Sequence, residues 1–155
     1  MIHLYLIMAT GVVHRFSPSS NLVWDTAAYD ALVLRHSKVE GPVEQYLVLD
    51  DSLEPDHYFF EAWCLSADGS GIDVDMAKAR AIHLAKIRRV RNKELAKKDI
   101  PWMKAMEAGD TSAQATIGTE KQVLRDLPAT FDITTGVTTP AQLKGRWPAE
   151  LPARE

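Results

Sequence analysis

Apolar residues in the first half of the chain occur in short runs that turn residues separate. The runs are rich in β-branched and aromatic residues, which is typical of strands. We predict strands in four of them: Ile2–Met8, Val12–Phe16, Val43–Leu49 and Tyr58–Leu65. A fifth run, Tyr29–Arg35, fits a strand or a short helix equally well. This pattern predicts a small antiparallel sheet or sandwich over residues 1–72.

The segments between these runs have the composition of loops. Ser17–Asn21 combines Ser, Pro and Asn, and Asp50–Asp56 is strongly acidic. We expect the carboxylates of the second segment to be solvated. Asp68–Gly71 contains two glycines, and we predict that it links the β-rich half to the second half.

The second half changes to a helical period. Met76, Leu84, Ile87, Val90 and Leu95 form one apolar stripe, which predicts a helix over Met76–Lys98 that Asp73 or Asp75 caps. Since proline suits a first helical turn and breaks a helix interior, Asp99-Ile100-Pro101 predicts a new, short helix. The predicted three-helix packet covers residues 73–128. Its members are Met76–Lys98, Pro101–Ala108 and a helix from the capping box Thr111–Gln114 to Asp126, before Leu127-Pro128.

Residues 129–155 form a predicted extended tail. Prolines recur in it at wide intervals, and only Thr139–Lys144 has the pattern of a helical turn. Its isolated apolar residues, such as Phe131 and Trp147, cannot build a core of their own. The tail therefore either lies across the helices or reaches into another subunit. Together these segments predict an α+β fold.

Charge is distributed unevenly along the chain. Residues 1–74 carry three basic and eleven acidic residues, whereas residues 75–98 carry nine basic and two acidic ones. The densest basic run, on the predicted helix over 78–98, predicts one surface of interaction: Arg80, Lys86, Arg88, Arg89, Arg91 and Lys93. These side chains are typical of phosphate contacts along nucleic acid. An acidic partner surface, on the N-terminal half of this chain or of a second copy, is the simpler explanation, and we favour it because the whole protein is acidic and the helix lacks aromatic residues that could stack on bases.

Candidate catalytic chemistry is sparse. The five histidines have no metal-ligand spacing, and His83 falls on the apolar stripe, where we expect a packed side chain. Cys64 lies in an apolar run, which predicts a buried thiol. Asp68–Gly71 lacks the spacing of a phosphate-binding loop. We therefore predict no catalytic residue, no metal site, no cofactor and no enzymatic activity.

Three segments of the second half resemble one family. They are Arg91–Leu95, Asp99–Met103 and Lys121–Pro128. They resemble an R-N-x-x-L helix, a D-x-x-(W/F) junction and a helix that ends in L-R-D-(L/I)-P in phage tail assembly chaperone-like and tail-fibre-associated proteins. A tail with Pro and Trp follows there, as Trp147-Pro148 does here. The likeness extends from about Ala77 to Trp147 and implies a bacteriophage context, with Trp102 and Trp147 as further candidate contact residues.

The sequence thus predicts a bacteriophage virion structural protein of the tail, fibre-attachment or collar region. We expect it to act through contacts with other phage structural proteins and to form a homo-oligomer. The short apolar start, Met1–Met8, lacks the length of a membrane span. We therefore expect synthesis in the host cytoplasm without membrane association, and a final location in the virion. A transient chaperone for tail or fibre assembly is the first alternative. A nucleic-acid-binding protein that uses the basic helix is the second, less favoured one.

Overall fold

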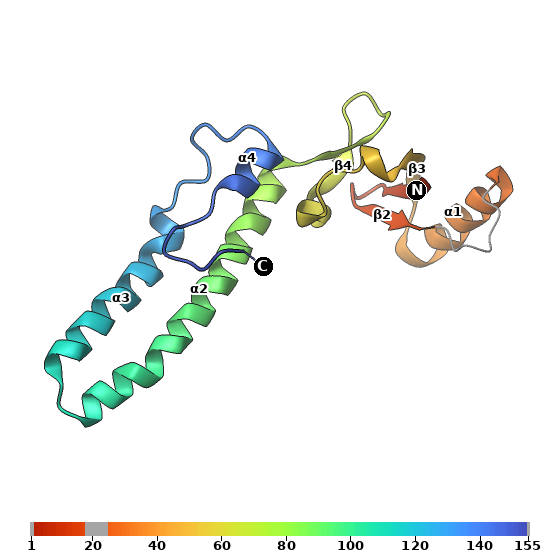
Figure 1. The fold of residues 1–155 in the computed structure, drawn as a ribbon. Coiled ribbons are helices and arrows are strands. Elements are labelled where there is room, and N and C mark those ends of the chain that lie inside the picture. The colour runs from red at the N-terminus through yellow and green to blue at the C-terminus, as the bar shows by residue number, and fades with distance from the viewer. Residues whose placement is uncertain (1, 18–24, 155) are drawn as a thin grey trace. The chain divides into compact units, whose positions relative to one another are not determined.

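The chain is described by a computed structural model for residues 2–17 and 25–154. It divides into two compact units, Met1–Ala79 and Arg80–Glu155, which we call the sheet unit and the hairpin unit. The first contains antiparallel sheets and the second is helical, so the predicted α+β class is confirmed (Figure 1). The loop predicted over Ser17–Asn21 lies, apart from Ser17, outside the described residues.

A three-stranded sheet organises the sheet unit. β1 (Ile2–Met8) is its central strand, with β2 (Val13–Phe16) and β3 (Val43–Asp50) as antiparallel neighbours. Leu6 of β1 lies opposite His14 on one side and opposite Tyr46 on the other. The strands predicted in these three places are confirmed.

The turn between β1 and β2 requires a glycine. The N–H of Gly11 donates to Met8 O at 2.8 Å, and Gly11 has a φ of 78°. Because side chains other than glycine rarely adopt a positive φ, Gly11 is the residue that allows the chain to reverse here.

One face of the sheet is covered by α1 (Thr26–Glu40). His36 of α1 contacts the rings of His14 and Phe16 in β2, and Tyr29 lies near Tyr46 in β3. The run Tyr29–Arg35, which fits a strand or a helix in isolation, is therefore helical. Asp25 starts this helix, because its carboxylate accepts the N–H of Ala28 at 2.9 Å.

The other face is covered by short elements. They are the 3₁₀ helices η1 (Asp51–Leu53) and η2 (His57–Ala62) and the two-stranded hairpin of β4 (Trp63–Leu65) and β5 (Ile72–Val74). The strand predicted over Tyr58–Leu65 is therefore wrong before Trp63. The reason is that Asp56 accepts the N–H of Tyr58 and starts a tight helix. Phe59 lies at a kink inside η2, and both Phe59 and Ala62 are buried.

Asp68–Gly71 is not a linker between the halves, as predicted, but part of the turn that joins β4 to β5. The N–H of Ser66 donates to Gly71 O and that of Gly69 donates to Ser66 O, both at 2.9 Å. The carboxylate of Asp68 accepts a hydrogen bond from the hydroxyl of Ser70, and this bond stabilises the turn. The β-rich region consequently continues through Val74.

α2 (Met76–Glu107) is one continuous helix, so the helix break predicted at Asp99–Pro101 is wrong. Pro101 lies inside it and removes one backbone N–H donor. Contacts with the neighbouring helix on both sides of the proline offset this loss. Lys121 Nζ donates to Asp99 Oδ1 at 2.6 Å and lies 5.8 Å from the centre of the Trp102 ring.

α3 (Thr111–Thr130) runs antiparallel to α2 and completes a helical hairpin (Figure 1). Its N-cap is Asp110 rather than the predicted Thr111, because the Asp110 carboxylate accepts the N–H of Ala113 at 2.9 Å. The predicted end at Asp126 is also wrong, since α3 continues past Pro128 to Thr130. Two long helices therefore replace the predicted packet of three.

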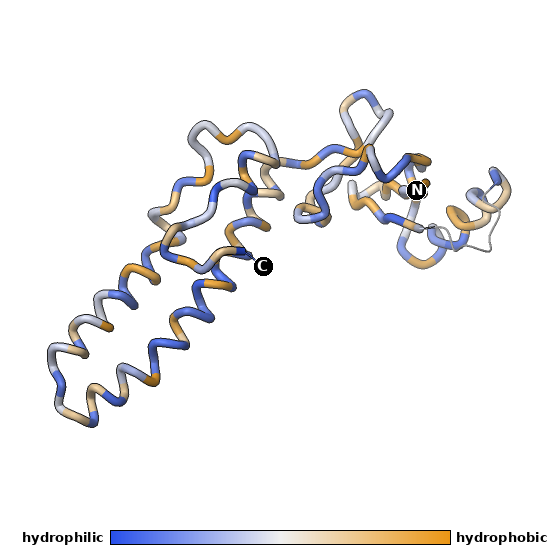
Figure 2. Tube along the Cα trace, in the orientation of Figure 1, coloured by the Kyte–Doolittle hydropathy of each residue, from blue (hydrophilic) through white to orange (hydrophobic). Residues whose placement is uncertain are grey.

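The tail lies across the two long helices, which is the first of the two arrangements that its sequence allows. The helical turn predicted over Thr139–Lys144 is confirmed as α4 (Pro140–Gly145), with a capping box between Thr139 and Gln142. Leu151 joins Ile87, Leu124 and Leu127 in one buried apolar cluster. Figure 2 shows apolar positions interspersed among hydrophilic ones along α2 and α3, as expected for helices that bury one side only.

Candidate functional site

The most unusual side chain of the sheet unit is Glu54, which follows η1. Its side chain is only 5% exposed, so the expectation of solvated carboxylates over Asp50–Asp56 is wrong for this residue. It faces the sheet rather than solvent. We call the group that surrounds it the Glu54 cluster, and its other members are His3, Tyr5, Arg15 and His57.

Hydrogen bonds converge on the Glu54 carboxylate from two strands and from η2. The hydroxyl of Tyr5 and the Nε of Arg15 both donate to Oε1, the latter at 2.7 Å. His57 Nε2 lies 2.6 Å from Oε2. Arg15 Nη2 also lies 2.9 Å from His3 Nε2, so this guanidinium connects two members of the cluster.

These contacts determine the charge of the cluster. Burial alone raises the pKa of a carboxyl group, but hydrogen bonds from Tyr5, Arg15 and His57 outweigh it and lower the pKa of Glu54 to about 2. Burial and the bond to Glu54 raise the pKa of Tyr5 above its usual range. Glu54 is thus an anion and Tyr5 a neutral donor across the ordinary pH range. Neither of these two groups has a pKa near 7, so the bond between them is suited to holding the segment after η1 against the sheet.

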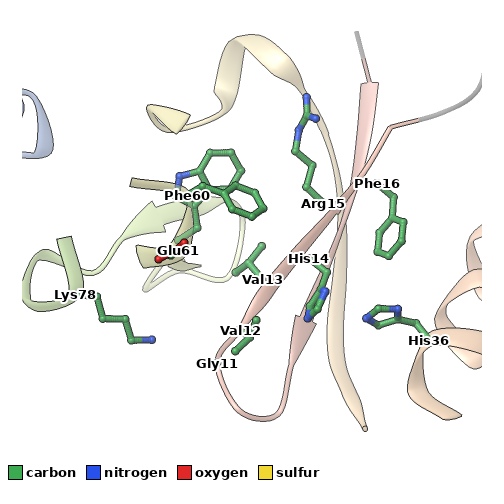
Figure 3. Close-up of a pocket in the computed structure, with 11 residues that line it drawn as sticks. Gly11, Val12, Val13, His14, Arg15, Phe16, His36, Phe60, Glu61 and Lys78 are labelled. Atoms are coloured by element: carbon green, nitrogen blue, oxygen red, sulfur yellow. The ribbon is translucent and has the colours of Figure 1, made fainter. Parts of the chain in front are cut away.

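A pocket of about 520 Å³ lies beside this cluster (Figure 3). It follows β2, and Arg15 belongs to both the cluster and the pocket wall. The rings of His14 and His36 lie 4.6 Å apart at one part of the wall, and Phe60 and Trp63 form another. The Nε1 of Trp63 and the Nε2 of His36 are buried atoms without a hydrogen-bond partner among the described residues.

Only some of the basic residues that were predicted as an interaction surface are exposed. Arg80 Nη2 donates to Val137 O at 3.1 Å and Arg91 Nη1 donates to Arg125 O at 3.3 Å, so both bind backbone within the hairpin unit. Lys86 is half-buried. Arg88, Arg89 and Lys93 are exposed along α2. The exposed basic surface is therefore smaller than the sequence suggests.

Both candidate tryptophans serve packing inside the hairpin unit. Trp102 is half-buried under Lys121. Trp147 donates its indole N–H to Pro152 O at 2.9 Å, and the Arg154 guanidinium lies 5.4 Å from its ring. His83 is fully buried, as expected for a stripe residue. The centre of its ring lies 5.9 Å from the centre of the Trp147 ring, and its Nε2 lies 2.6 Å from Arg146 O. Burial lowers the pKa of His83, which favours its neutral form.

Three large apolar residues near the end of α2 are exposed, and we call them the tip patch. Ile100, Met103 and Met106 are 65%, 53% and 52% exposed. They are spaced by three residues and therefore project from neighbouring parts of one helix surface. This group of exposed apolar side chains is the candidate contact surface of the hairpin unit.

Other chemistry is limited in the parts of the chain that the structure describes. No group of three or more His, Cys, Asp or Glu residues there is placed to hold a metal ion. Cys64 is half-buried, and burial raises the pKa of its thiol. None of the described helices is long and apolar enough to cross a membrane.

Sequence reasoning missed the Glu54 cluster because its members lie far apart in the chain. Only one signal was present: Arg15 is a single permanent cation in a predicted strand, and it requires a partner if the strand is buried.

Comparisons with family models, with curated proteins and with solved structures find no match to this chain.

Proposed function

We propose that the protein is a bacteriophage virion component of the tail, fibre-attachment or collar region, and that it acts by binding other phage structural proteins. The tip patch is the observation that carries this proposal. A chain that exposes three large apolar side chains at the end of a long hairpin gains free energy when a partner covers them.

The position of the patch agrees with the family resemblance. Ile100 and Met103 belong to the segment Asp99–Met103, one of the three that resemble phage tail assembly chaperone-like and tail-fibre-associated proteins. In this chain that segment is not a helix junction. It is a continuous stretch of α2 in which Ile100 and Met103 are exposed while Asp99 and Trp102 contact Lys121 of α3.

Purified virions test the location directly. Peptides of this protein should appear in the mass spectrum of washed particles, at a constant ratio to the other tail proteins. Their complete absence from the particles would refute the virion proposal.

The tip patch is tested by a double substitution that preserves helix propensity, Met103→Gln with Met106→Gln. We expect it to lower the affinity for isolated tail proteins by about tenfold, because two buried thioether side chains would be lost from the interface. Val123→Thr, at an apolar residue of α3 that is 48% exposed, is the matched control and should bind as the unchanged protein does. Equal binding by all three proteins would show that the tip patch is not the contact surface.

A transient chaperone for tail or fibre assembly is the second candidate. The two methionines favour it, because flexible thioether side chains adapt to partners that are later released. This function predicts recovery of a tail or fibre protein with the chain from infected cells, together with its absence from mature particles. Failure to recover any such protein from the cells would remove this candidate.

A further inference from the structure

β2 has an open edge. Among the residues that the structure describes, β2 pairs with β1 alone, so its other side has no neighbouring strand. Met8 N donates to Val12 O at 2.9 Å, which shows that Val12 directs its backbone groups toward β1. Since these groups alternate along an antiparallel strand, His14 also faces β1, whereas Val13 and Arg15 direct their N–H and C=O groups outward.

The pocket beside the Glu54 cluster runs along this edge (Figure 3). His36 of α1, with His14 and Phe16 of β2, lines the part of the pocket on one face of the sheet. Phe60 and Trp63 line the part of the pocket on the opposite face, where the ring centres of Trp63 and Tyr5 lie 6.2 Å apart. The open backbone edge is therefore flanked by aromatic side chains on both faces.

We propose that the edge of β2 binds an extended peptide segment of a partner protein, which adds to the sheet as a fourth strand. The spacing of the outward groups selects this occupant. Two N–H and C=O pairs, one at Val13 and one at Arg15, are matched by the backbone of another extended chain, which offers donors and acceptors at the same repeat. The inference rests on the edge and the pocket and does not depend on the proposed phage function.

The two walls predict which side chains the segment carries. Residues opposite Val13 and Arg15 project on the face of Phe60 and Trp63, because directly paired residues share a face. We expect apolar side chains there. The residue between them projects toward His14 and His36, and we expect a polar side chain there, since the Nε2 of His36 is buried without a partner among the described residues.

Peptide selection on the full-length protein tests this inference. The probe is a displayed library of random dodecapeptides, and the readout is the exchange rate of individual backbone amides, with and without an enriched peptide. We expect slowed exchange at Val13 and Arg15, by about tenfold or more. The amides of Tyr46 and Val48, which the same alternation places on the outer edge of β3, should not change. A library without enriched peptides, or enriched peptides that leave Val13 and Arg15 unprotected, would overturn the proposal.

Substitution by proline separates the edge from the rest of the fold. Val13→Pro removes an outward N–H and leaves the bonds to β1 in place, and we expect it to weaken the enriched peptide about tenfold. Val48→Pro removes the equivalent N–H from β3, at a residue that is more exposed than Val13, and is the control. If Val13→Pro does not fold, Phe60→Ser takes its place, because Phe60 is 38% exposed, and the same loss is expected. Unchanged binding of the enriched peptide by these variants contradicts the proposal. Slowed exchange at Val13 and Arg15 in the absence of peptide, caused by self-association, also contradicts it, because the edge would then bind a second copy of the chain.

Discussion

The two units of this chain differ in where they place their charges. The sheet unit buries the Glu54 carboxylate and the Tyr5 ring against the sheet and half-buries the Arg15 side chain that pairs with them. The hairpin unit keeps its ion pairs outside, where Lys98 binds Glu120 and Lys121 binds Asp99 across the helices. Its interior is the apolar cluster around Ile87, together with the neutral His83.

The two units therefore derive their stability from different interactions. A buried ion pair is costly to break, because the remaining partner is left charged in a poorly solvated place. Pairs on a surface contribute little, so the hairpin unit depends on apolar burial instead. The sheet unit should therefore be sensitive to single polar substitutions, and the hairpin unit to apolar ones.

The largest effect is expected from Glu54→Ala. Loss of this carboxylate leaves Arg15 and Tyr5 without their acceptor, and we expect the free energy of unfolding of the sheet unit to fall by about 4 kcal/mol. Urea titration followed by tryptophan fluorescence and circular dichroism measures it. Glu44→Ala, at an exposed acidic residue of β3, should change stability by less than about 0.5 kcal/mol. A loss for Glu54→Ala as small as that of the control would contradict the difference between the units.

Leu127→Ala is the corresponding test of the hairpin unit. Leu127 lies in the cluster with Ile87, Leu124 and Leu151, and we expect a loss of about 3 kcal/mol from its removal. Helical signal at 222 nm follows this unit during denaturation. Val123→Ala, at an exposed position of the same helix, is the control and should have a much smaller effect.

Acid should lower the free energy of unfolding of the sheet unit, by less than the two substitutions above do. Because the pKa of Glu54 is lowered to about 2 in the folded protein, its stabilising effect is fully present above the pKa of the unfolded chain, near 4.5. It is lost as the pH falls from 4.5 toward 2, and we expect a loss of about 2 kcal/mol in the sheet unit. Urea titrations at pH 6 and pH 3 measure it. In Glu54→Gln this pH dependence should be reduced, and an unchanged slope would show that other groups cause it.

The smallest effect is expected at the start of α3. Asp110→Ala removes the carboxylate that accepts the N–H of Ala113, which should cost about 1 kcal/mol. Thr111→Ala, at the position that the sequence alone favours as the cap, should cost only a few tenths of a kcal/mol. If thermal denaturation shows a larger loss of stability for Thr111→Ala than for Asp110→Ala, Thr111 is the N-cap of α3.

The positions of secondary structure were predictable where one local signal dominated. β1 is an apolar run and α4 carries a complete capping box at Thr139, and both are found where their residues predict them. The prediction failed where a tertiary contact overrode a local preference. Pro101 predicts a helix end, but α2 continues through it, with contacts of Asp99 and Trp102 to Lys121 on both sides of the proline.

The Glu54 cluster was beyond sequence reasoning for a different reason. Glu54 lies among other acidic residues in a segment that is typical of a solvated loop. Its burial follows only from the pairing of β1 with β2, which brings Tyr5 opposite Arg15 on one face of the sheet. Sequence alone shows an unexplained arginine in a strand, and the fold supplies its partner.

The place of Leu151 in the cluster around Ile87 has a consequence for the order in which this protein matures on the ribosome. The hairpin of α2 and α3 is translated before Leu151, so its apolar seam stays uncovered until the segment that carries Leu151 has been added. Nascent chains that stall in this interval display an incomplete core, and such surfaces are the ones that chaperones engage and that aggregate. Translation through the tail is therefore the step that closes the hairpin unit.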